Sequence, residues 1–370
     1  MDALCGRDPR GTRRRRCATL TSVDVRSPLR AARRQASVLH ARVRTESEWR
    51  KSRDGRADIA VFHEFLPPPT GGGSQFLRAL TGEFRGRGLE VEVNRISGTT
   101  PVCLFNSFNF EFARLQRFAR RECRLVHRVD GPIGTYRGFD DGTDRRILEI
   151  NHALADATVF QSRYSLERHV ELGLELRSPV VITNAVDRAI FHPPAAREAL
   201  PGRRVRIIAS SWSDNPRKGA TTFEWLDRHL DHDRFELTFV GRSSVALGRA
   251  TMIPALPSEE LADLLRSQDL YLAASLDDPC SNALLEALAC GLPAAFAASG
   301  GHPELVGEAG LPFSSPEELP AVLERLASEI DARRDAISVP SLAEVADRYL
   351  EVLAGPPESW RAGQPVQASS

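Results

Sequence analysis

The chain has 370 residues, of which 42% are hydrophobic and 26% charged, and its formal net charge is zero. This composition is ordinary for a soluble globular protein, and the length suits two domains of about 100–200 residues each. No apolar run approaches the roughly 20 residues of a membrane-spanning helix, and no charged-then-apolar start resembles a secretory signal. The six cysteines form no C-x-x-C pair, which argues against a disulfide framework and leads us to expect a cytoplasmic protein.

The first 57 residues carry sixteen basic residues against six acidic ones and show no sustained apolar period. We therefore expect residues 1–57 to form a disordered basic arm. Such an arm can contact an anionic membrane surface, which would bring the protein to the inner face of a membrane. It could also be a targeting peptide or a non-native upstream extension. Because aromatic residues are not interleaved with the basic ones, we do not expect specific recognition of nucleic acid.

Residues 58–195 alternate short apolar strands with helical segments, which favours a parallel sheet covered by helices. A strand at 58–63, a Pro- and Gly-rich loop at 67–73 and a helix at 74–85 form the usual start of a Rossmann-like unit. The glycine loop is weak evidence by itself, because any tight turn from strand to helix uses one. Further strands are predicted at 89–93, 102–106, 124–129, 157–160 and 179–182, and further helices at 110–121, at 145–155 and from 161.

Two polar residues, His127 and Asp130, lie at the end of the strand predicted at 124–129. In doubly wound folds ligands gather at the carboxyl ends of the strands, so both are candidates for contact with a substrate. The alternative is a hydrogen-bonded histidine and a turn aspartate with structural roles. The polar loop at 136–144 is rich in hydroxyl-binding groups and is a candidate acceptor site, although solvated loops have the same composition.

After a linker at 193–202, residues 203–340 repeat the α/β pattern. A strand at 205–210 is followed by Lys218-Gly219 and a predicted helix at 221–229, so Lys218 lies on a loop after a strand. Further strands are predicted at 235–240 and 269–273, and a helix at 258–266. An amphipathic helix at 341–354 and a Pro-, Gly- and Ser-rich tail at 355–370, which we expect to be disordered, complete the chain.

The segment 277–304 combines chemistry that suits phosphate and sugar. A helix is predicted from Ala283, and the free N–H groups at a helix start attract an anion. Asp278 precedes this helix and Glu286 lies off its apolar face. Carboxylates in these places can accept hydrogen bonds from the hydroxyls of a ribose and a sugar. The alternative is that Asp278 is only an N-cap and Glu286 only a solvated helix residue.

This segment resembles the retaining glycosyltransferases of family 4, which have the GT-B fold. The resemblance rests on two acidic residues eight positions apart, Asp278 and Glu286, with Asp where the family usually has Glu. It rests also on the intact turns EALACGLP at 286–293 and GG-x-PE at 300–304.

Two further signatures of the family are similar here but incomplete. The sequence NAVD…F-x-P at 184–193 has Ala185 in place of the usual glycine. Lys218-Gly219 match, but the arginine of the family's preceding GR pair is missing, because Ser-Trp-Ser stands at 211–213. Arg217 is the nearest candidate for the missing charge.

The resemblance covers residues 58–354 and implies an α/β protein of the GT-B fold. Two Rossmann-like doubly wound domains, at 58–195 and 203–340, would face a central cleft, and the helix at 341–354 would cross back to the first. The implied reaction moves a hexose-type sugar, with retention, from a nucleotide-sugar donor to a hydroxyl of an unknown acceptor. The implied catalytic residues are His127, Asp130, Lys218 and Asp278. The implied donor-binding residues are Gly72, Gly73, Arg217, Lys218, Asp278, Ser281, Asn282 and Glu286.

In this scheme different residues bind different parts of the donor. Lys218, helped by Arg217 and the helix N–H groups, would hold the leaving diphosphate. Glu286 would bind the ribose, Asp278 the transferred sugar, and His127 or Asp130 the reacting end. The scheme contains no metal, so no cofactor is expected, although adjacent acids at 140–141 and 277–278 leave a metal open.

Three other functions remain open on the sequence. A sugar-nucleotide epimerase of the same fold would form product from the donor alone. A non-catalytic scaffold would keep the signatures without turnover, and the missing arginine and Asp278 give this alternative some weight. A nucleic-acid binder acting through the basic arm would retain DNA in a salt-dependent way.

Overall fold

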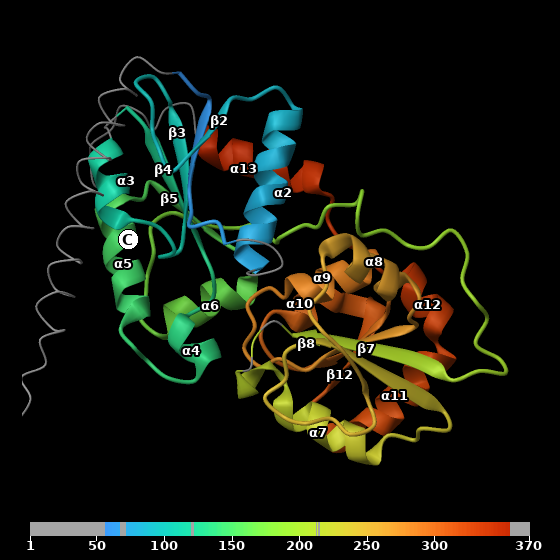
Figure 1. Ribbon diagram of the computed structural model, residues 1–370. Helices are drawn as coiled ribbons and strands as arrows, with labels where there is room; N and C mark the ends of the chain where they lie inside the picture. The colour runs from blue at the N-terminus through green and yellow to red at the C-terminus, as the bar shows by residue number, and fades with distance from the viewer. Residues whose placement is uncertain (1–55, 67–71, 120–121, 212, 214, 356–370) are drawn as a thin grey trace, which may run out of the picture. The chain divides into compact units, whose positions relative to one another are not determined.

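The computed structural model describes residues 56–66, 72–119, 122–211, 213 and 215–355. The predicted basic arm, apart from its last two residues, and the predicted tail, apart from its first, lie outside this part of the chain. The described residues belong to one compact unit. This unit has two lobes, each with a parallel six-stranded sheet (Figure 1). The predicted pair of Rossmann-like α/β domains is therefore confirmed.

The first lobe has the strand order β2-β1-β3-β4-β5-β6, with every neighbouring pair parallel. Its strands are β1 (Ile59–Phe62), β2 (Val91–Val93), β3 (Val102–Asn106), β4 (Arg124–Val129), β5 (Ala157–Phe160) and β6 (Pro179–Val181). Its helices are α2 (Gly72–Gly86), α3 (Phe112–Phe118), α4 (Ile133–Arg137), α5 (Thr143–Leu154) and α6 (Arg163–Glu171). β1, β3 and β5 are buried along their whole length, as continuous apolar strands covered on both faces should be.

The second lobe has the order β12-β11-β10-β7-β8-β9, again parallel throughout. Its strands are β7 (Val205–Ser211), β8 (Phe235–Gly241), β9 (Thr251–Ile253), β10 (Leu270–Ala273), β11 (Ala294–Ala297) and β12 (Gly310–Phe313). Its helices are α7 (Ala220–His229), α8 (Ser258–Arg266), α9 (Asn282–Ala289), α10 (His302–Val306), α11 (Leu319–Ser328) and α12 (Ile330–Asp335), with a 3-10 turn η1 (Pro216–Lys218) before α7. β9 was not predicted because it is short and its first two residues are exposed.

The helix α13 (Leu342–Ala354) packs on the first lobe, against α2, β3 and β4 (Figure 1). Its buried residues Val345, Ala346, Tyr349 and Leu353 belong to the same apolar cluster as Phe76 of α2. Ser341 and Glu344 form a capping box that fixes where the helix begins. The C-terminal helix thus crosses back from the second lobe, as the resemblance implied.

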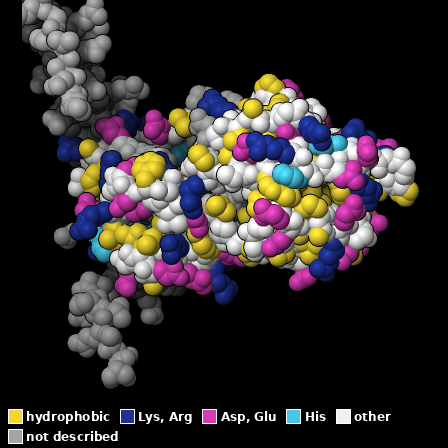
Figure 2. All heavy atoms as spheres, turned by 90° about the horizontal axis from the view of Figure 1, so that it is seen from below, with side chains coloured by type: hydrophobic (Ala, Val, Ile, Leu, Met, Phe, Trp, Pro, Cys, Tyr) yellow, Lys and Arg dark blue, Asp and Glu magenta, His cyan; other side chains and the backbone are white. Residues whose placement is uncertain are grey.

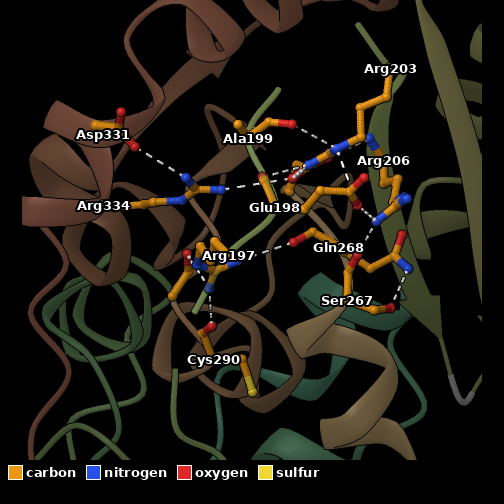
Figure 3. A network of polar contacts seen from close by, with 12 residues as sticks. Arg197, Glu198, Ala199, Arg203, Arg206, Ser267, Gln268, Cys290, Asp331 and Arg334 are labelled. Atoms are coloured by element: carbon orange, nitrogen blue, oxygen red, sulfur yellow. Dashed lines mark hydrogen bonds and ion pairs between the residues drawn. The ribbon is translucent and has the colours of Figure 1, made fainter. Parts of the chain in front are cut away.

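Arginines in and next to the linker between the lobes bind the second lobe through hydrogen bonds and an ion pair (Figure 3). Arg197 donates to the carbonyls of Gln268 at 3.2 Å and Cys290 at 2.5 Å. Arg203 binds the buried carboxylate of Asp269 with two nitrogens, at 2.6 and 2.8 Å. Because bidentate guanidinium–carboxylate pairs hold a defined geometry, this end of the linker moves with the second lobe.

On the face drawn in Figure 2, basic and acidic side chains are interspersed over the described residues. None of the helices in the described part of the chain has the length and apolarity that crossing a membrane requires.

Candidate functional site

A cavity of about 480 Å³ is lined by residues of both lobes. It lies where β4, β7 and β10 end, because Asp130, Ser211 and Ala274 all line it. This is the edge at which doubly wound sheets bind ligands, and the volume is in the range of small-molecule sites, about 300–1,000 Å³. The predicted site residues in its lining are Gly72, Gly73, Asp130, Lys218, Asp278, Ser281, Asn282 and Glu286.

The start of α9 opens onto this cavity. Ser281 is its N-cap, and the Ser281 Oγ accepts a hydrogen bond from the Leu284 N–H at 3.3 Å. The cap is therefore Ser281 and not Asp278, whose Oδ1 instead accepts from the Cys280 N–H at 3.2 Å. Ser281, Asn282 and Ala283 line the cavity. N–H groups in the first turn of a helix have no intrahelical acceptor, so this end of α9 can receive an anion.

Lys218 and Asp278 form an ion pair within the lining. The Lys218 Nζ lies 2.8 Å from the Asp278 Oδ2, and Asp278 is only 8% exposed. Burial alone would raise the pKa of Asp278, but the charge of Lys218, the neighbouring His302 and the hydrogen bonds from Lys218 and Cys280 outweigh it and lower the pKa. The aspartate is therefore ionised and holds the lysine at the edge of the cavity.

Glu286 lies in the second turn of α9 with 6% of its surface exposed. Its carboxyl lines the cavity and has no hydrogen-bond partner among the described residues. Burial raises its pKa to about 8. It is not a solvated helix residue but a buried acceptor at the cavity wall, and buried polar groups of this kind normally have a partner.

Arg217 is not part of the lining, so its contact with the donor phosphates remains a prediction. Its guanidinium pairs with Asp277, whose other carboxylate oxygen accepts from the Tyr164 hydroxyl at 2.8 Å. Its aliphatic stem lies against Gly138, where an added Cβ would come within 3.0 Å of the Arg217 Cδ. Arg217 is thus held by Asp277 of its own lobe and lies against Gly138 of the first lobe.

His127 is also not part of the lining, and the structure corrects its predicted role at the reacting end. It lies inside β4 and is fully buried. Its Nε2 donates to the Ser107 carbonyl at 2.8 Å, and its Nδ1 accepts from the Asn151 Nδ2 at 3.1 Å. Burial lowers its pKa to about 3. A neutral imidazole with both nitrogens bonded and its ring stacked on Phe105 at 4.3 Å is part of the core.

The adjacent Arg128 has the organising role that the sequence did not reveal. It is fully buried and donates to the Asn106 Oδ1 at 2.5 Å and to the Asn184 Oδ1 at 3.0 Å. The Asp130 carboxylate lies 3.4 Å from its Nη1, and the Phe76 ring lies 4.9 Å from its central carbon. An arginine in the interior of a buried strand was the signal in the sequence, since charged residues are rarely fully buried without a partner.

The Arg128 network reaches α9 across the cavity floor. Asn184 donates to the Asn282 Oδ1 at 2.8 Å, and Asn282 donates to the Gly72 carbonyl at 2.7 Å. Asn282 therefore joins the two lobes, and Gly72 has no room for a side chain, because an added Cβ would lie 2.9 Å from the Asn282 Nδ2. The signatures at 72–73 and 184–193 thus contribute backbone and amide groups to one connected structure.

The described residues contain no group of three or more His, Cys, Asp or Glu side chains that could hold a metal ion. The expectation that the site uses no metal remains a prediction.

Comparison with known proteins bears on this site directly. Residues 216–329 match the family described as Glycosyl transferases group 1. This range contains Lys218, the start of α9 and Glu286. The matched segment is therefore similar to this family over the part of the second lobe that carries the start of α9. No curated protein matches the sequence.

Several solved structures share the fold of the whole described chain. Sucrose-phosphate synthase (tll1590) from Thermosynechococcus elongatus is 16% identical over 80% of this chain and 95% of its own, with a TM-score of 0.61. Anabaena Alr3699/HepE in complex with UDP and glucose is 15% identical over 80% and 98%, with a TM-score of 0.60. AviGT4, a glycosyltransferase involved in Avilamycin A biosynthesis, is 17% identical over 81% and 99%, with a TM-score of 0.56. The chain therefore has the GT-B fold, in which the matched segment forms most of the second lobe.

Proposed function

We propose that this enzyme transfers a hexose-type sugar, with retention of configuration, from a nucleotide-sugar donor to a hydroxyl group of an acceptor. The observation that carries the proposal is the convergence of three groups on one cavity: Lys218, the N-terminus of α9 and the unpartnered carboxyl of Glu286. Together they match the charge and hydroxyl pattern of a nucleoside diphosphate. Each lies in the segment that matches the glycosyltransferase family.

The donor's diphosphate would lie between Lys218 and the first turn of α9. Asp278 forms an ion pair with Lys218, so an entering phosphate would compete with Asp278 for the ammonium group. Once displaced, Asp278 can accept a hydrogen bond from the transferred sugar. As the bond from the anomeric carbon to the diphosphate oxygen breaks, negative charge grows on that oxygen. A fixed cation and oriented N–H groups stabilise such charge, often the largest contribution to catalysis.

The ribose hydroxyls would donate to Glu286. An uncharged Glu286 carboxyl still has acceptor capacity, and hydroxyl donors would favour its ionised form. The complexes of Anabaena HepE with UDP and with UDP-glucose support testing uridine donors first.

The acceptor would approach from the first lobe, where Asp130, Tyr136 and Gln161 line the cavity. Asp130 accepts a hydrogen bond from Gln161, which fixes the carboxylate at the cavity wall. From this place Asp130 could orient the acceptor hydroxyl. Closure of the lobes over the donor would exclude water and so limit hydrolysis.

A panel of UDP-, GDP-, ADP- and dTDP-hexoses tests the proposal, first by thermal shift and then by product analysis. A ligand that binds only the native state raises the melting temperature, so one donor class should stand out. Transfer with retention to an added acceptor supports the proposal. Epimerised donor without acceptor would replace it with an epimerase, and binding of every donor without turnover would indicate a scaffold.

Activity should survive EDTA, and a loss restored by Mg²⁺ or Mn²⁺ would overturn the metal-free scheme.

A further inference from the structure

The cavity has fewer free cations than a diphosphate requires. Among the described residues that line it, Lys218 and Arg137 are the basic ones, and Asp130, Asp278 and Glu286 are the acidic ones. Lys218 is already paired with Asp278. Between β7 and η1, the described residues in the lining are Ser213 and Asn215, neither of which is basic, and Arg217 is not in the lining. The second lobe therefore offers one cation to a group that carries at least two negative charges.

Arg137 comes from the first lobe and is held beside η1, the turn that carries Lys218. It is the last residue of α4, which ends at Gly138 in the left-handed conformation with φ 83°. The residue before it, Tyr136, accepts a hydrogen bond from the Asn215 Nδ2 at 3.4 Å. The residue after it, Gly138, lies against the stem of Arg217. Both neighbours of Arg137 thus contact the η1 segment, and Arg137 itself lines the cavity.

The guanidinium of Arg137 pairs with Asp141, hydrogen-bonds to the Tyr136 side chain and has its central carbon 5.9 Å from the centre of the Phe108 ring. Its Nη1 lies 3.0 Å from the Asp141 Oδ2, and the two side chains are 31% and 37% exposed. Exposed pairs of this kind contribute only about 0–1 kcal/mol, so a phosphate can replace Asp141 at little cost. Arg128 is fully buried among three partners, and Arg217 does not line the cavity, so neither offers its charge there.

We propose that Arg137 binds the donor's diphosphate from the first lobe and replaces the arginine that the second lobe lacks. The inference rests on the proposed function and names a residue for it. A guanidinium can bind two phosphate oxygens at once, so the diphosphate would be bound by Arg137 on one lobe and by Lys218 on the other. Donor binding would thereby draw α4 and η1 together and favour the closed arrangement.

Calorimetry of a nucleoside diphosphate and of its nucleoside tests this inference. The probe is whichever of UDP, GDP, ADP and dTDP binds the parent most tightly, together with the matching nucleoside. Arg137→Gln should weaken diphosphate binding at least tenfold and leave nucleoside binding within about twofold. Arg137→Lys should lie between, because it keeps the charge but not the bidentate geometry. The diphosphate affinity of Arg137→Gln should also depend less steeply on salt.

Two control variants separate contact from general charge and from local structure. Arg145→Gln removes the same charge from an exposed site of the same lobe, and Asp141→Asn removes the partner of Arg137. Both should bind the diphosphate as the parent does, or more tightly in the case of Asp141→Asn. Melting temperatures of all variants show whether the fold is intact.

The failures of the two proposals look different. If the parent binds none of the four nucleoside diphosphates, the proposed function fails. If the parent binds one and Arg137→Gln binds it equally well, the function stands and the role of Arg137 is overturned. Equal loss of nucleoside and diphosphate binding would make Arg137 a structural residue, and a raised acceptor KM with unchanged diphosphate binding would assign it to the acceptor. Either result overturns the inference.

Discussion

The two lobes contribute to the same cavity in different ways. The second lobe contributes Lys218 and residues near the ends of β7 and β10, and in addition one continuous segment, in which Asp278, Ser281, Asn282 and Glu286 follow each other along the chain at the start of α9. The first lobe contributes single residues from the ends of separate strands and helices, such as Gly72, Asp130, Arg137 and Gln161. The contribution of the second lobe can be recognised in the sequence as a motif, whereas that of the first lobe is assembled only by folding.

The two kinds of site are also stabilised differently. In the second lobe the helix itself orients the groups, because its caps and apolar face determine where each side chain points. In the first lobe the buried guanidinium of Arg128 connects Asn106, Asp130 and Asn184. We therefore expect substitutions in the second lobe to affect binding and turnover, and substitutions in the Arg128 network to affect folding.

The largest effect should follow from Arg128→Met. Asn106, Asn184 and Asp130 would lose a common partner, and removing one member of a buried charged network costs about 3–5 kcal/mol. Chemical denaturation should show a fall of this size in the free energy of unfolding, or no soluble protein. If Arg128→Met and Asn282→Ala each lower the free energy of unfolding by less than about 1 kcal/mol, the Arg128 network does not stabilise the first-lobe side of the site.

Lys218→Gln should have the next largest effect, on turnover with little loss of stability. Removing one group that stabilises developing charge costs about 2.7–4 kcal/mol, or roughly a hundred- to thousandfold in kcat. Lys218 is partly exposed and paired with an aspartate that keeps other hydrogen bonds, so the melting temperature should change little. Steady-state rates and melting curves of the same preparation check both statements, and an unchanged kcat would remove Lys218 from the mechanism.

Glu286→Gln should weaken nucleoside diphosphate binding by about one to two powers of ten, because a hydrogen bond to a charged group contributes about 1.5–3 kcal/mol. Asp278→Asn should leave this binding nearly intact and lower turnover of the full donor. Calorimetry and steady-state rates compare the two variants. If both behave like the parent, the start of α9 is not the donor site.

Glu286 should also make stability depend on pH. Its pKa is about 8 in the folded chain against an ordinary value of 4.5, so between these values the native state holds a proton that the unfolded chain has lost. Its contribution to the free energy of unfolding is complete below pH 4.5 and is lost as the pH rises towards 8. Glu286→Gln should therefore melt higher than the parent at pH 8.5, and the difference should shrink towards pH 5. A pH-independent difference would contradict the burial of this carboxyl.

The smallest effect on function is expected for His127→Gln, although the resemblance placed this residue at the reacting end. The substitution should lower stability by about 1–3 kcal/mol, since it disturbs buried hydrogen bonds. The activity of the protein that remains folded should stay within about twofold. A hundredfold loss of kcat at unchanged stability would contradict this prediction and would mean that His127 takes part in catalysis.

Much of this protein could be predicted from the sequence because its information is local. The parallel strands of both sheets follow from short buried apolar runs, and β3, β4, β5 and α8 begin and end at the predicted residues. Asp278 and Glu286 could be placed at one site because helix caps, helix dipoles and the four-residue spacing of a helix operate within about ten residues. Lys218 is 60 residues away along the chain, and only the family resemblance placed it at the same site.

Tertiary structure alone decided which strand residues face the cavity and which cations remain free. His127 and Arg128 are adjacent, and successive side chains of a strand point to opposite faces. Which face meets the cavity depends on what packs against β4, and the sequence of β4 does not contain this. In the same way, the sequence indicated that Arg217 could bind the donor phosphates. In the structure Arg217 pairs with Asp277, which also binds Tyr164, and its stem lies against Gly138. Arg137 became a candidate only through the contact between α4 and η1. Whether a cation can bind a ligand depends on how strongly other residues already bind it, and those residues are distant in the chain.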